Sequence, residues 1–151
     1  MVTQPLKYPI GIQSFKELRE SGYVYVDKTA FVHQLISTGK YYFLRRPRRF
    51  GKSLMLSTLD AYFRGKKHLF EGLDIDSIES DWLEYPVIHI DMNVGTYSSI
   101  ASLTDSLRIT MGRIADEYGV TIDSGQFVEL QFNDLIIKLS KNGAQCGDTH
   151  R

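Results

Sequence analysis

The stretch Tyr41-Tyr42-Phe43-Leu44-Arg45-Arg46-Pro47-Arg48-Arg49-Phe50-Gly51-Lys52-Ser53-Leu54 decides the fold that we expect for this chain. An aromatic and aliphatic run leads into the stretch, and a helical pattern follows it. Strand, loop and helix in this order are the context in which a phosphate-binding loop, or Walker A motif, operates. The sequence therefore predicts a P-loop whose backbone amides, with those of the first helical turn, surround phosphate oxygens.

The candidate nucleotide-binding residues lie at the C-terminal end of this stretch. We expect the Lys52 ammonium to reach the β- and γ-phosphates of ATP and the Ser53 hydroxyl to ligate Mg²⁺. Arg46 stands where such a loop usually has its first glycine, so the motif is incomplete. The full candidate set is Arg48, Arg49, Phe50, Gly51, Lys52, Ser53 and Leu54.

Size and composition are those of one globular domain. The chain has 151 residues, of which 42% are hydrophobic and 24% charged, which is enough to bury a core. Lys+Arg and Asp+Glu number 18 each, so net charge predicts no general attraction to nucleic acid or membranes. The single cysteine, Cys146, excludes an internal disulfide and favours a reducing compartment. Without an apolar run that spans a bilayer or a signal-peptide pattern, we expect a cytoplasmic protein.

Helix signals recur along the chain. Ser14 and Glu17 fit a capping box, and Asp27 is a good N-cap for the next helix. The predicted helices run from Ser14 to near Gly22, over Lys28–Ser37, from the loop to Gly65, from Ser98 or Ser99 to Gly119, and over Gln126–Ser140. In the last of these, the residues expected to face inward are Phe127, Leu130, Leu135, Ile136 and Leu139.

Three segments have strand composition, namely Tyr23–Val26, Tyr41–Leu44 and Pro86–Asp91. Strands interleaved with helices indicate an α/β fold. We expect the aromatic residues before the loop to lie in the core or the sheet rather than to form a platform for stacking bases. Residues 66–84 are expected to be loop-like, with Leu69, Phe70, Leu73, Ile75 and Trp82 as anchors.

Five blocks in the same order and spacing resemble a known family. They are Tyr25–Thr29, Tyr42–Leu44, Arg46–Ser53, Phe70–Leu73 and Tyr85–Asp91. Over roughly residues 8–143 the chain resembles the predicted AAA-ATPase-like proteins, in which Arg at position 46 is usual. The resemblance implies a P-loop NTPase fold, a three-layer α/β sandwich, with ATP binding and hydrolysis. Many of those proteins carry a nuclease-like domain of the PD-(D/E)XK type at the C-terminus.

The carboxylates that ATP hydrolysis needs are not evident in the sequence. Such enzymes use an aspartate for Mg²⁺ and a neighbouring glutamate to orient water. Asp91 is the one candidate aspartate, but Met92 and Asn93 follow it, so we interpret it as a strand-end or turn residue and assign no catalytic residue. The resemblance places the Mg²⁺ aspartate on a later apolar strand, where this chain has the polar run Ala144–Arg151. We therefore expect an incomplete sandwich with little or no hydrolysis.

We expect residues 1–143 to form the N-terminal part of the ATPase-like domain and residues 144–151 to be a tail. One hypothesis is a frameshift after Gln145, because Cys146–Arg151 has synonymous codons that read, one base later, as Val-Val-Ile-Leu-Ile-Asp or Val-Val-Ile-Leu-Ile-Glu. The alternative is an ordinary disordered C-terminus. An incomplete sandwich leaves strand edges and apolar helix faces uncovered, so we expect a chain that is unstable alone, aggregates or needs a partner.

A second hypothesis is a non-catalytic module that uses the basic loop to hold nucleic acid or an acidic protein partner. Arg45, Arg46, Arg48, Arg49 and Lys52 fall within eight positions. We favour local pairing of these side chains with phosphates or carboxylates over a nucleic-acid contact. Loss of magnesium–ATP binding on Lys52→Ala would favour the ATPase hypothesis, whereas unchanged ATP binding would favour the module.

A nucleotide kinase is disfavoured because no acceptor site or lid is recognisable. The sequence leaves the oligomeric state open.

Overall fold

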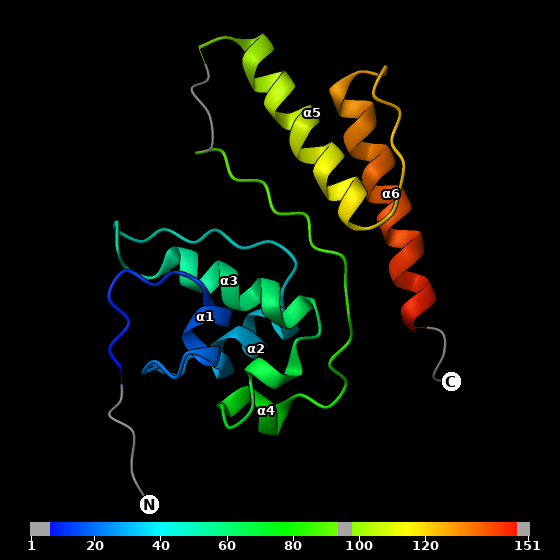
Figure 1. The fold of residues 1–151 in the computed structure, drawn as a ribbon. Helices are drawn as coiled ribbons and strands as arrows, with labels where there is room; N and C mark the ends of the chain where they lie inside the picture. The colour runs from blue at the N-terminus through cyan, green and yellow to red at the C-terminus, as the bar shows by residue number, and fades with distance from the viewer. Residues whose placement is uncertain (1–6, 94–97, 148–151) are drawn as a thin grey trace, which may run out of the picture. The chain divides into compact units, whose positions relative to one another are not determined.

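The structure is a computed structural model that describes residues 7–93 and 98–147. Figure 1 shows that regular structure in this part of the chain is helical. The chain divides into two compact units, unit 1 (Met1–Leu83) and unit 2 (Glu84–Arg151), and each is described by itself. The helices are α1 (Phe15–Glu20), α2 (Thr29–Thr38), α3 (Lys52–Phe63), the 3₁₀ helix η1 (Lys67–Leu69), α4 (Asp74–Ile78), α5 (Ile100–Glu117) and α6 (Val128–Gly147).

The prediction of an α/β P-loop sandwich is wrong. Across residues 7–93 and 98–147 no strand forms, and β-pairing takes the form of isolated bridges, such as the parallel one between Lys7 and Tyr23. Strand composition favours an extended backbone, but a strand exists only where a neighbouring chain completes the ladder of hydrogen bonds. None of the three segments with strand composition meets a neighbour that continues such a ladder within the described residues. Tyr23–Val26 has the single bridge to Lys7, and all three segments run as irregular chain.

The core of unit 1 forms around aromatic rings. Phe15 of α1 and Phe70 are both fully buried, and their ring centroids are 4.9 Å apart. The Tyr62 ring from α3 and the Trp82 ring lie 6.4 and 5.0 Å from that of Phe70. Each such tilted or edge-to-face contact contributes about 0.5–1.5 kcal/mol beyond area burial. The expected anchors are confirmed, since Leu69, Phe70 and Ile75 are at most 1% exposed, and Leu73 and Trp82 pack against the same core.

Asp27 connects the beginnings of α2 and α4. Its Oδ1 accepts from the Thr29 N–H at 2.8 Å and from the Thr29 hydroxyl at 2.7 Å, and its Oδ2 accepts from the Asp74 N–H at 2.7 Å. The prediction that Asp27 is the N-cap residue of this helix is wrong, since α2 begins at Thr29 and has Lys28 as its N-cap, but the Asp27 carboxylate does accept from the first amide of the helix. Burial raises the pKa of Asp27, but the hydrogen bonds outweigh burial and hold the pKa below its usual value.

Hydrogen bonds from two residues of α1 fix this helix within unit 1. Arg19 donates to the Leu69 carbonyl at 2.7 Å and to the Glu71 carbonyl at 2.6 Å. The Phe15 N–H donates to the Ser57 hydroxyl of α3 at 2.9 Å. Because α1 is held against α3, the chain that enters α1 also lies close to the beginning of α3.

Unit 2 contains the helix pair α5 and α6. Ser99 and Ser102 form a capping box at the start of α5, and Gly119, with φ of 64°, follows its C-cap residue as the sequence predicts. The buried core is Met111, Ile114, Ala115, Leu135 and Leu139. The inward face predicted for α6 is right for Leu135 and Leu139 but wrong for Phe127, Leu130 and Ile136, which are 77%, 52% and 42% exposed. No helix in the described residues is long and apolar enough to cross a bilayer.

Candidate nucleotide-binding site

The basic loop, residues 45–51, reverses the chain before α3. Arg49 and Gly51 have φ values of 66° and 72°, in the left-handed region. Glycine accepts this conformation freely, whereas a residue with a Cβ atom is strained there by about 1–2 kcal/mol. These two residues turn the backbone so that α3 begins at Lys52, directly after Gly51.

The first turn of α3 presents unpaired amides. The N–H groups of Lys52, Ser53 and Leu54 have no acceptor within the described chain, and no side chain caps the helix. Free amides at a helix N-terminus, with the positive end of the helix dipole, favour a bound anion. In this respect the backbone fits a phosphate group.

Lys52 is engaged by the basic loop itself. Its Nζ donates to the Arg46 carbonyl at 2.5 Å and, more weakly, to the Pro47 carbonyl at 3.4 Å. The Arg46 guanidinium donates in turn to the Phe50 carbonyl at 3.3 Å. Arg46, which replaces the expected glycine, therefore closes the loop with its side chain and holds the lysine with its backbone.

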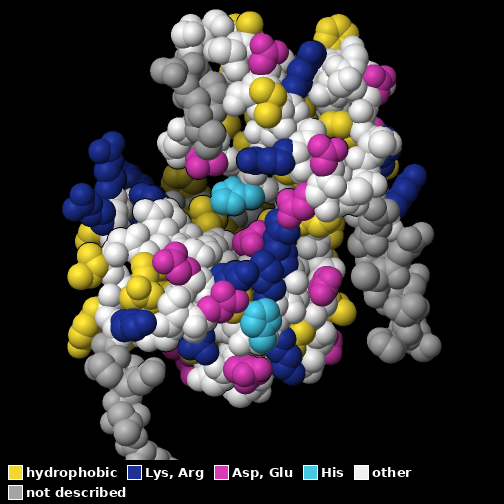
Figure 2. Space-filling model, in the orientation of Figure 1, with side chains coloured by type: hydrophobic (Ala, Val, Ile, Leu, Met, Phe, Trp, Pro, Cys, Tyr) yellow, Lys and Arg dark blue, Asp and Glu magenta, His cyan; other side chains and the backbone are white. Residues whose placement is uncertain are grey.

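The charged side chains in and around the loop are all basic. No Asp or Glu occurs between Asp27 and Asp60. Figure 2 shows Lys and Arg side chains gathered at the edge of unit 1, where Figure 1 places the loop. In the described chain, no ion pair joins a carboxylate to any cation of this interval. The cations are Lys28, Lys40, Arg45, Arg46, Arg48, Arg49 and Lys52. Local carboxylate pairing, which the sequence favoured as one option, is not observed there.

A cavity of about 540 Å³ lies beside the start of α3. One wall is the segment Pro9–Gln13, and the other contains Arg49 and Gly51–Leu54. Five of the seven candidate residues therefore line one space. Phe50 lines a second cavity instead, and Arg48 lines neither of these two cavities.

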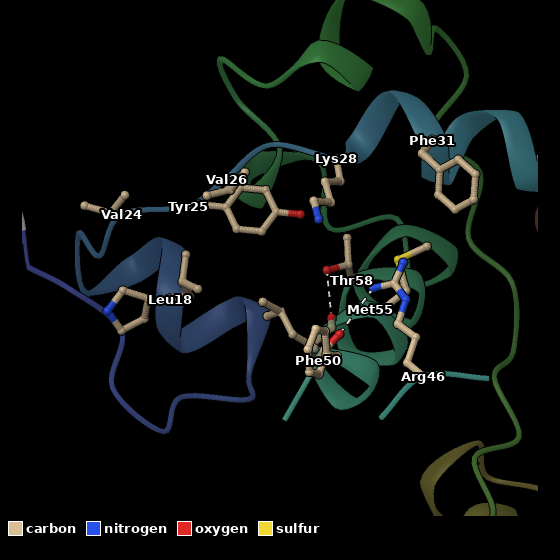
Figure 3. Close-up of a pocket in the computed structure, with 13 residues that line it drawn as sticks. Leu18, Val24, Tyr25, Val26, Lys28, Phe31, Arg46, Phe50, Met55 and Thr58 are labelled. Atoms are coloured by element: carbon tan, nitrogen blue, oxygen red, sulfur yellow. Dashed lines mark hydrogen bonds between the residues drawn. The ribbon is translucent and has the colours of Figure 1, made fainter. Parts of the chain in front are cut away.

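The second cavity, of about 380 Å³, is mainly apolar and is drawn in Figure 3. Lys28 and Tyr25 lie at one side of it, and Arg46 lies near Met55 at the other. Burial raises the pKa of the Tyr25 hydroxyl. The cavity adjoins the basic loop through Phe50 and Gly51, but Lys52 and Ser53 line the first cavity and not this one.

No carboxylate lines either of these cavities. Asp91, in unit 2, accepts hydrogen bonds from the Asn93 backbone at 2.8 Å and side chain at 3.0 Å. These hydrogen bonds lower the pKa of Asp91, and they support its interpretation as a turn residue. Within the described residues no three His, Cys, Asp or Glu side chains group as metal ligands, so Ser53, exposed at the first cavity, remains the candidate Mg²⁺ ligand.

Reasoning from the sequence missed the segment Pro9–Gln13. Pro9 and Gly11 indicate a defined turn, and Gly11 has φ of 77°. Nothing in the spacing of these residues places them beside a loop some forty positions later. The signal that was present is the N-cap residue Ser14, whose side chain accepts from the Glu17 N–H and fixes where α1 begins and hence where the preceding chain must lie.

Comparisons with known proteins give a family and one relative. The family model described as "Predicted AAA-ATPase" matches residues 9–146. A protein of Azotobacter chroococcum mcd 1, named "Uncharacterized protein in vnfD 5'region", is 52% identical over 91 residues, which are 59% of this chain and 17% of that protein. The match thus spans about a sixth of the relative's length. No solved structure matches.

Proposed function

The chain belongs to the AAA-ATPase-like family, and on that premise we propose that the basic loop and the start of α3 bind the phosphates of ATP together with Mg²⁺. One observation carries the proposal. Lys52, Ser53 and Leu54, whose backbone amides have no acceptor within the described chain, all line the same cavity. Free backbone donors beside a lysine are the features by which a loop and helix start bind a polyphosphate.

Each candidate residue has a distinct role in this proposal. The Lys52 ammonium leaves the Arg46 and Pro47 carbonyls and pairs with the β- and γ-phosphates, because a phosphate oxygen is charged and a carbonyl is neutral. The amides of Lys52 to Leu54 donate to phosphate oxygens. The Ser53 hydroxyl would hold Mg²⁺, which would neutralise negative charge on the phosphates. Arg49 and Arg48 add positive charge at the open side.

The remaining wall of the cavity suits the nucleoside part of the ligand. Pro9–Gln13 faces the phosphate-binding residues across about 540 Å³, within the usual range of about 300–1,000 Å³ for ligand cavities. This segment is apolar at Pro9, Ile10 and Ile12. We infer that the phosphates bind at α3 and that the sugar and base extend toward Pro9–Gln13.

Binding with little turnover is the expected behaviour. Hydrolysis needs a group that orients the attacking water and a carboxylate that completes the Mg²⁺ site. The residues that line the two cavities include no carboxylate. Without these groups the bound phosphates lack a general base, so ATP should leave the site largely unhydrolysed.

Calorimetric titration with magnesium–ATP tests the proposal. We expect Lys52→Ala to weaken binding by about 10- to 100-fold, because a charged hydrogen bond contributes about 1.5–3 kcal/mol. Lys67→Ala is the matched control, since Lys67 is an exposed lysine of unit 1 that lines neither cavity. Ser53→Ala should retain ATP binding but lose most of its dependence on Mg²⁺.

Two results would refute the proposal. One is the absence of both heat and thermal stabilisation when folded wild-type chain is mixed with magnesium–ATP. The other is equal affinity of the Lys52→Ala and Lys67→Ala variants. Phosphate release measured in the same samples tests separately whether bound ATP is hydrolysed. Turnover at a rate typical of ATPases would contradict the proposal of binding with little hydrolysis.

A further inference from the structure

The run from Tyr41 to Leu44 alternates in exposure. Tyr41 and Phe43 are 95% and 91% exposed, whereas Tyr42 and Leu44 are 54% and 39% exposed. This period of two is that of an extended backbone, in which successive side chains point to opposite sides. Figure 1 draws the run without helical turns. The expectation that these aromatic residues lie in a core or sheet is therefore wrong for Tyr41, Tyr42 and Phe43.

One side of the run is anchored and the other is free. The Tyr42 hydroxyl donates to the Leu35 carbonyl of α2 and lies 3.2 Å from the Thr38 hydroxyl. Tyr42 thus fixes the run against the end of α2. On the opposite side, Tyr41, Phe43 and Arg45 follow one another at every second position, and we call these three residues the aromatic face.

The spacing of the aromatic face suits consecutive bases. Residues two apart in an extended chain are separated by about 6.4–6.8 Å, which is wide enough for a planar base to stack on each ring. Any base can stack on an aromatic side chain, because every base has a π face. Two exposed rings at this spacing form a platform for unpaired bases rather than for a duplex, whose bases already stack on one another.

The charge beside the aromatic face is complementary to a phosphate backbone. Arg45 is the third member of the face, and Arg48 is exposed in the loop that follows. Neither arginine forms an ion pair with a carboxylate within the described chain. The absence of acidic residues between Asp27 and Asp60 removes the local repulsion that a polyanion would meet.

We propose that the aromatic face and the adjacent arginines bind single-stranded nucleic acid. Bases stack on Tyr41 and Phe43, and the phosphates pair with Arg45 and Arg48. Stacking and phosphate pairing read no base edge, so binding is independent of sequence. The stacking part of the contact is separate from the ATP site, because Tyr41, Phe43 and Arg45 line neither of the two cavities described above, whereas Arg48 has a role in both proposals.

Fluorescence anisotropy with labelled oligo(dT) and oligo(U) tests the proposal. The Tyr41→Ala/Phe43→Ala double variant should bind at least about tenfold more weakly, since stacking contributes about 1–3 kcal/mol per base. The control is Tyr8→Ala, which removes an aromatic ring that is 77% exposed elsewhere in unit 1. Both variants change exposed rings, and circular dichroism verifies that each keeps the wild-type fold.

Salt dependence isolates the contribution of Arg45. In a plot of log affinity against log salt, Arg45→Gln should reduce the slope by about 0.7, the value of one phosphate contact to a single strand. Arg113→Gln, which changes an exposed arginine of α5, should leave the slope unchanged. The Tyr41→Ala/Phe43→Ala double variant should leave magnesium–ATP binding intact, which separates this contact from the ATP site.

Three outcomes would overturn the proposal. The first is that wild-type chain binds neither oligonucleotide at low salt. The second is that the double variant binds as tightly as Tyr8→Ala. The third is a self-association, measured by sedimentation, that the double variant abolishes and that oligonucleotide does not compete with, because the face would then be a contact between copies of this chain.

Discussion

Gly51 has a backbone conformation that few other residues accept. Its φ is 72°, and a Cβ atom placed on it would meet nothing within 4 Å. Gly51→Ala should therefore cost only backbone strain, about 1–2 kcal/mol of unfolding free energy, measured by denaturant titration. Gly112→Ala is the control, because its Cβ would also meet nothing within 4 Å but lies inside α5. There alanine should stabilise by about 0.5–1 kcal/mol, and equal effects at both glycines would contradict the explanation.

Asp27 gives a prediction about charge and hydrogen bonding. Asp27→Asn keeps one oxygen for Thr29 but loses the acceptor for the Asp74 N–H. The variant should lose about 1–2 kcal/mol of unfolding free energy at neutral pH, because a charged acceptor is replaced in a partly exposed site. Asp105→Asn, in an exposed position of α5, should change stability by less than about 0.5 kcal/mol.

The same site has a defined pH dependence. The folded-state pKa of Asp27 is lowered, so its contribution is present above the unfolded pKa of about 4 and is lost as pH falls through the folded value. The difference between wild type and Asp27→Asn should therefore shrink below about pH 4. A difference that stays constant through this range would show that the carboxylate charge is not involved.

At the residue scale, a motif marks candidate residues but does not specify the contacts that they make. Lys52 and Ser53 could be chosen as candidates because a basic loop followed by a helix start is a local pattern. The hydrogen bond from the Lys52 ammonium to the Arg46 carbonyl could not be predicted, because it depends on loop geometry that residue types do not specify. Pro9–Gln13 was missed for a related reason, since its place at the cavity follows from how α1 packs against α3.

Ser99 supplies the prediction at the scale of elements. The sequence left open whether Ser98 or Ser99 caps α5, and the structure has Ser99 accepting from the Ser102 N–H at 3.1 Å. Ser99→Ala should cost about 1 kcal/mol of unfolding free energy, whereas Ser98→Ala should be neutral. Thermal and denaturant unfolding of the two variants decide between them, and a larger loss for Ser98→Ala would reverse the assignment.

Helices were largely predictable and strands were not. A helix completes its own hydrogen bonds, so caps such as Ser14 and stops such as Gly119 suffice to locate it. A strand depends on a partner that is distant in sequence. Tyr41–Leu44 keeps the alternation of a strand without forming one, which shows that composition sets backbone shape while pairing requires a neighbour.

At the scale of the whole molecule, exposed apolar side chains are the feature that most favours aggregation. Ile109 is 73% exposed on α5, whereas Ile114 of the same helix is 4% exposed. Ile114→Ala should cost about 2–5 kcal/mol of unfolding free energy, and Ile109→Ala should change it by less than about 0.5 kcal/mol. Denaturant unfolding measures both values.

Ile109→Ala, which should hardly change stability, should reduce self-association of the chain. Ile109→Ala removes exposed apolar surface and should raise the concentration at which sedimentation detects aggregates. A wild-type chain that stays monomeric and unfolds in one cooperative transition at high concentration would contradict the expectation that this chain aggregates or needs a partner.

The hydrogen bonds from the Lys52 ammonium to two neutral carbonyls have a kinetic consequence. If these bonds to Arg46 and Pro47 must break first, a rearrangement within the protein precedes binding of the triphosphate. In a stopped-flow experiment the observed association rate would then level off as ligand concentration rises, at the speed of that rearrangement. The equilibrium affinity would be lower than that of an open loop, in proportion to the fraction of molecules that are open.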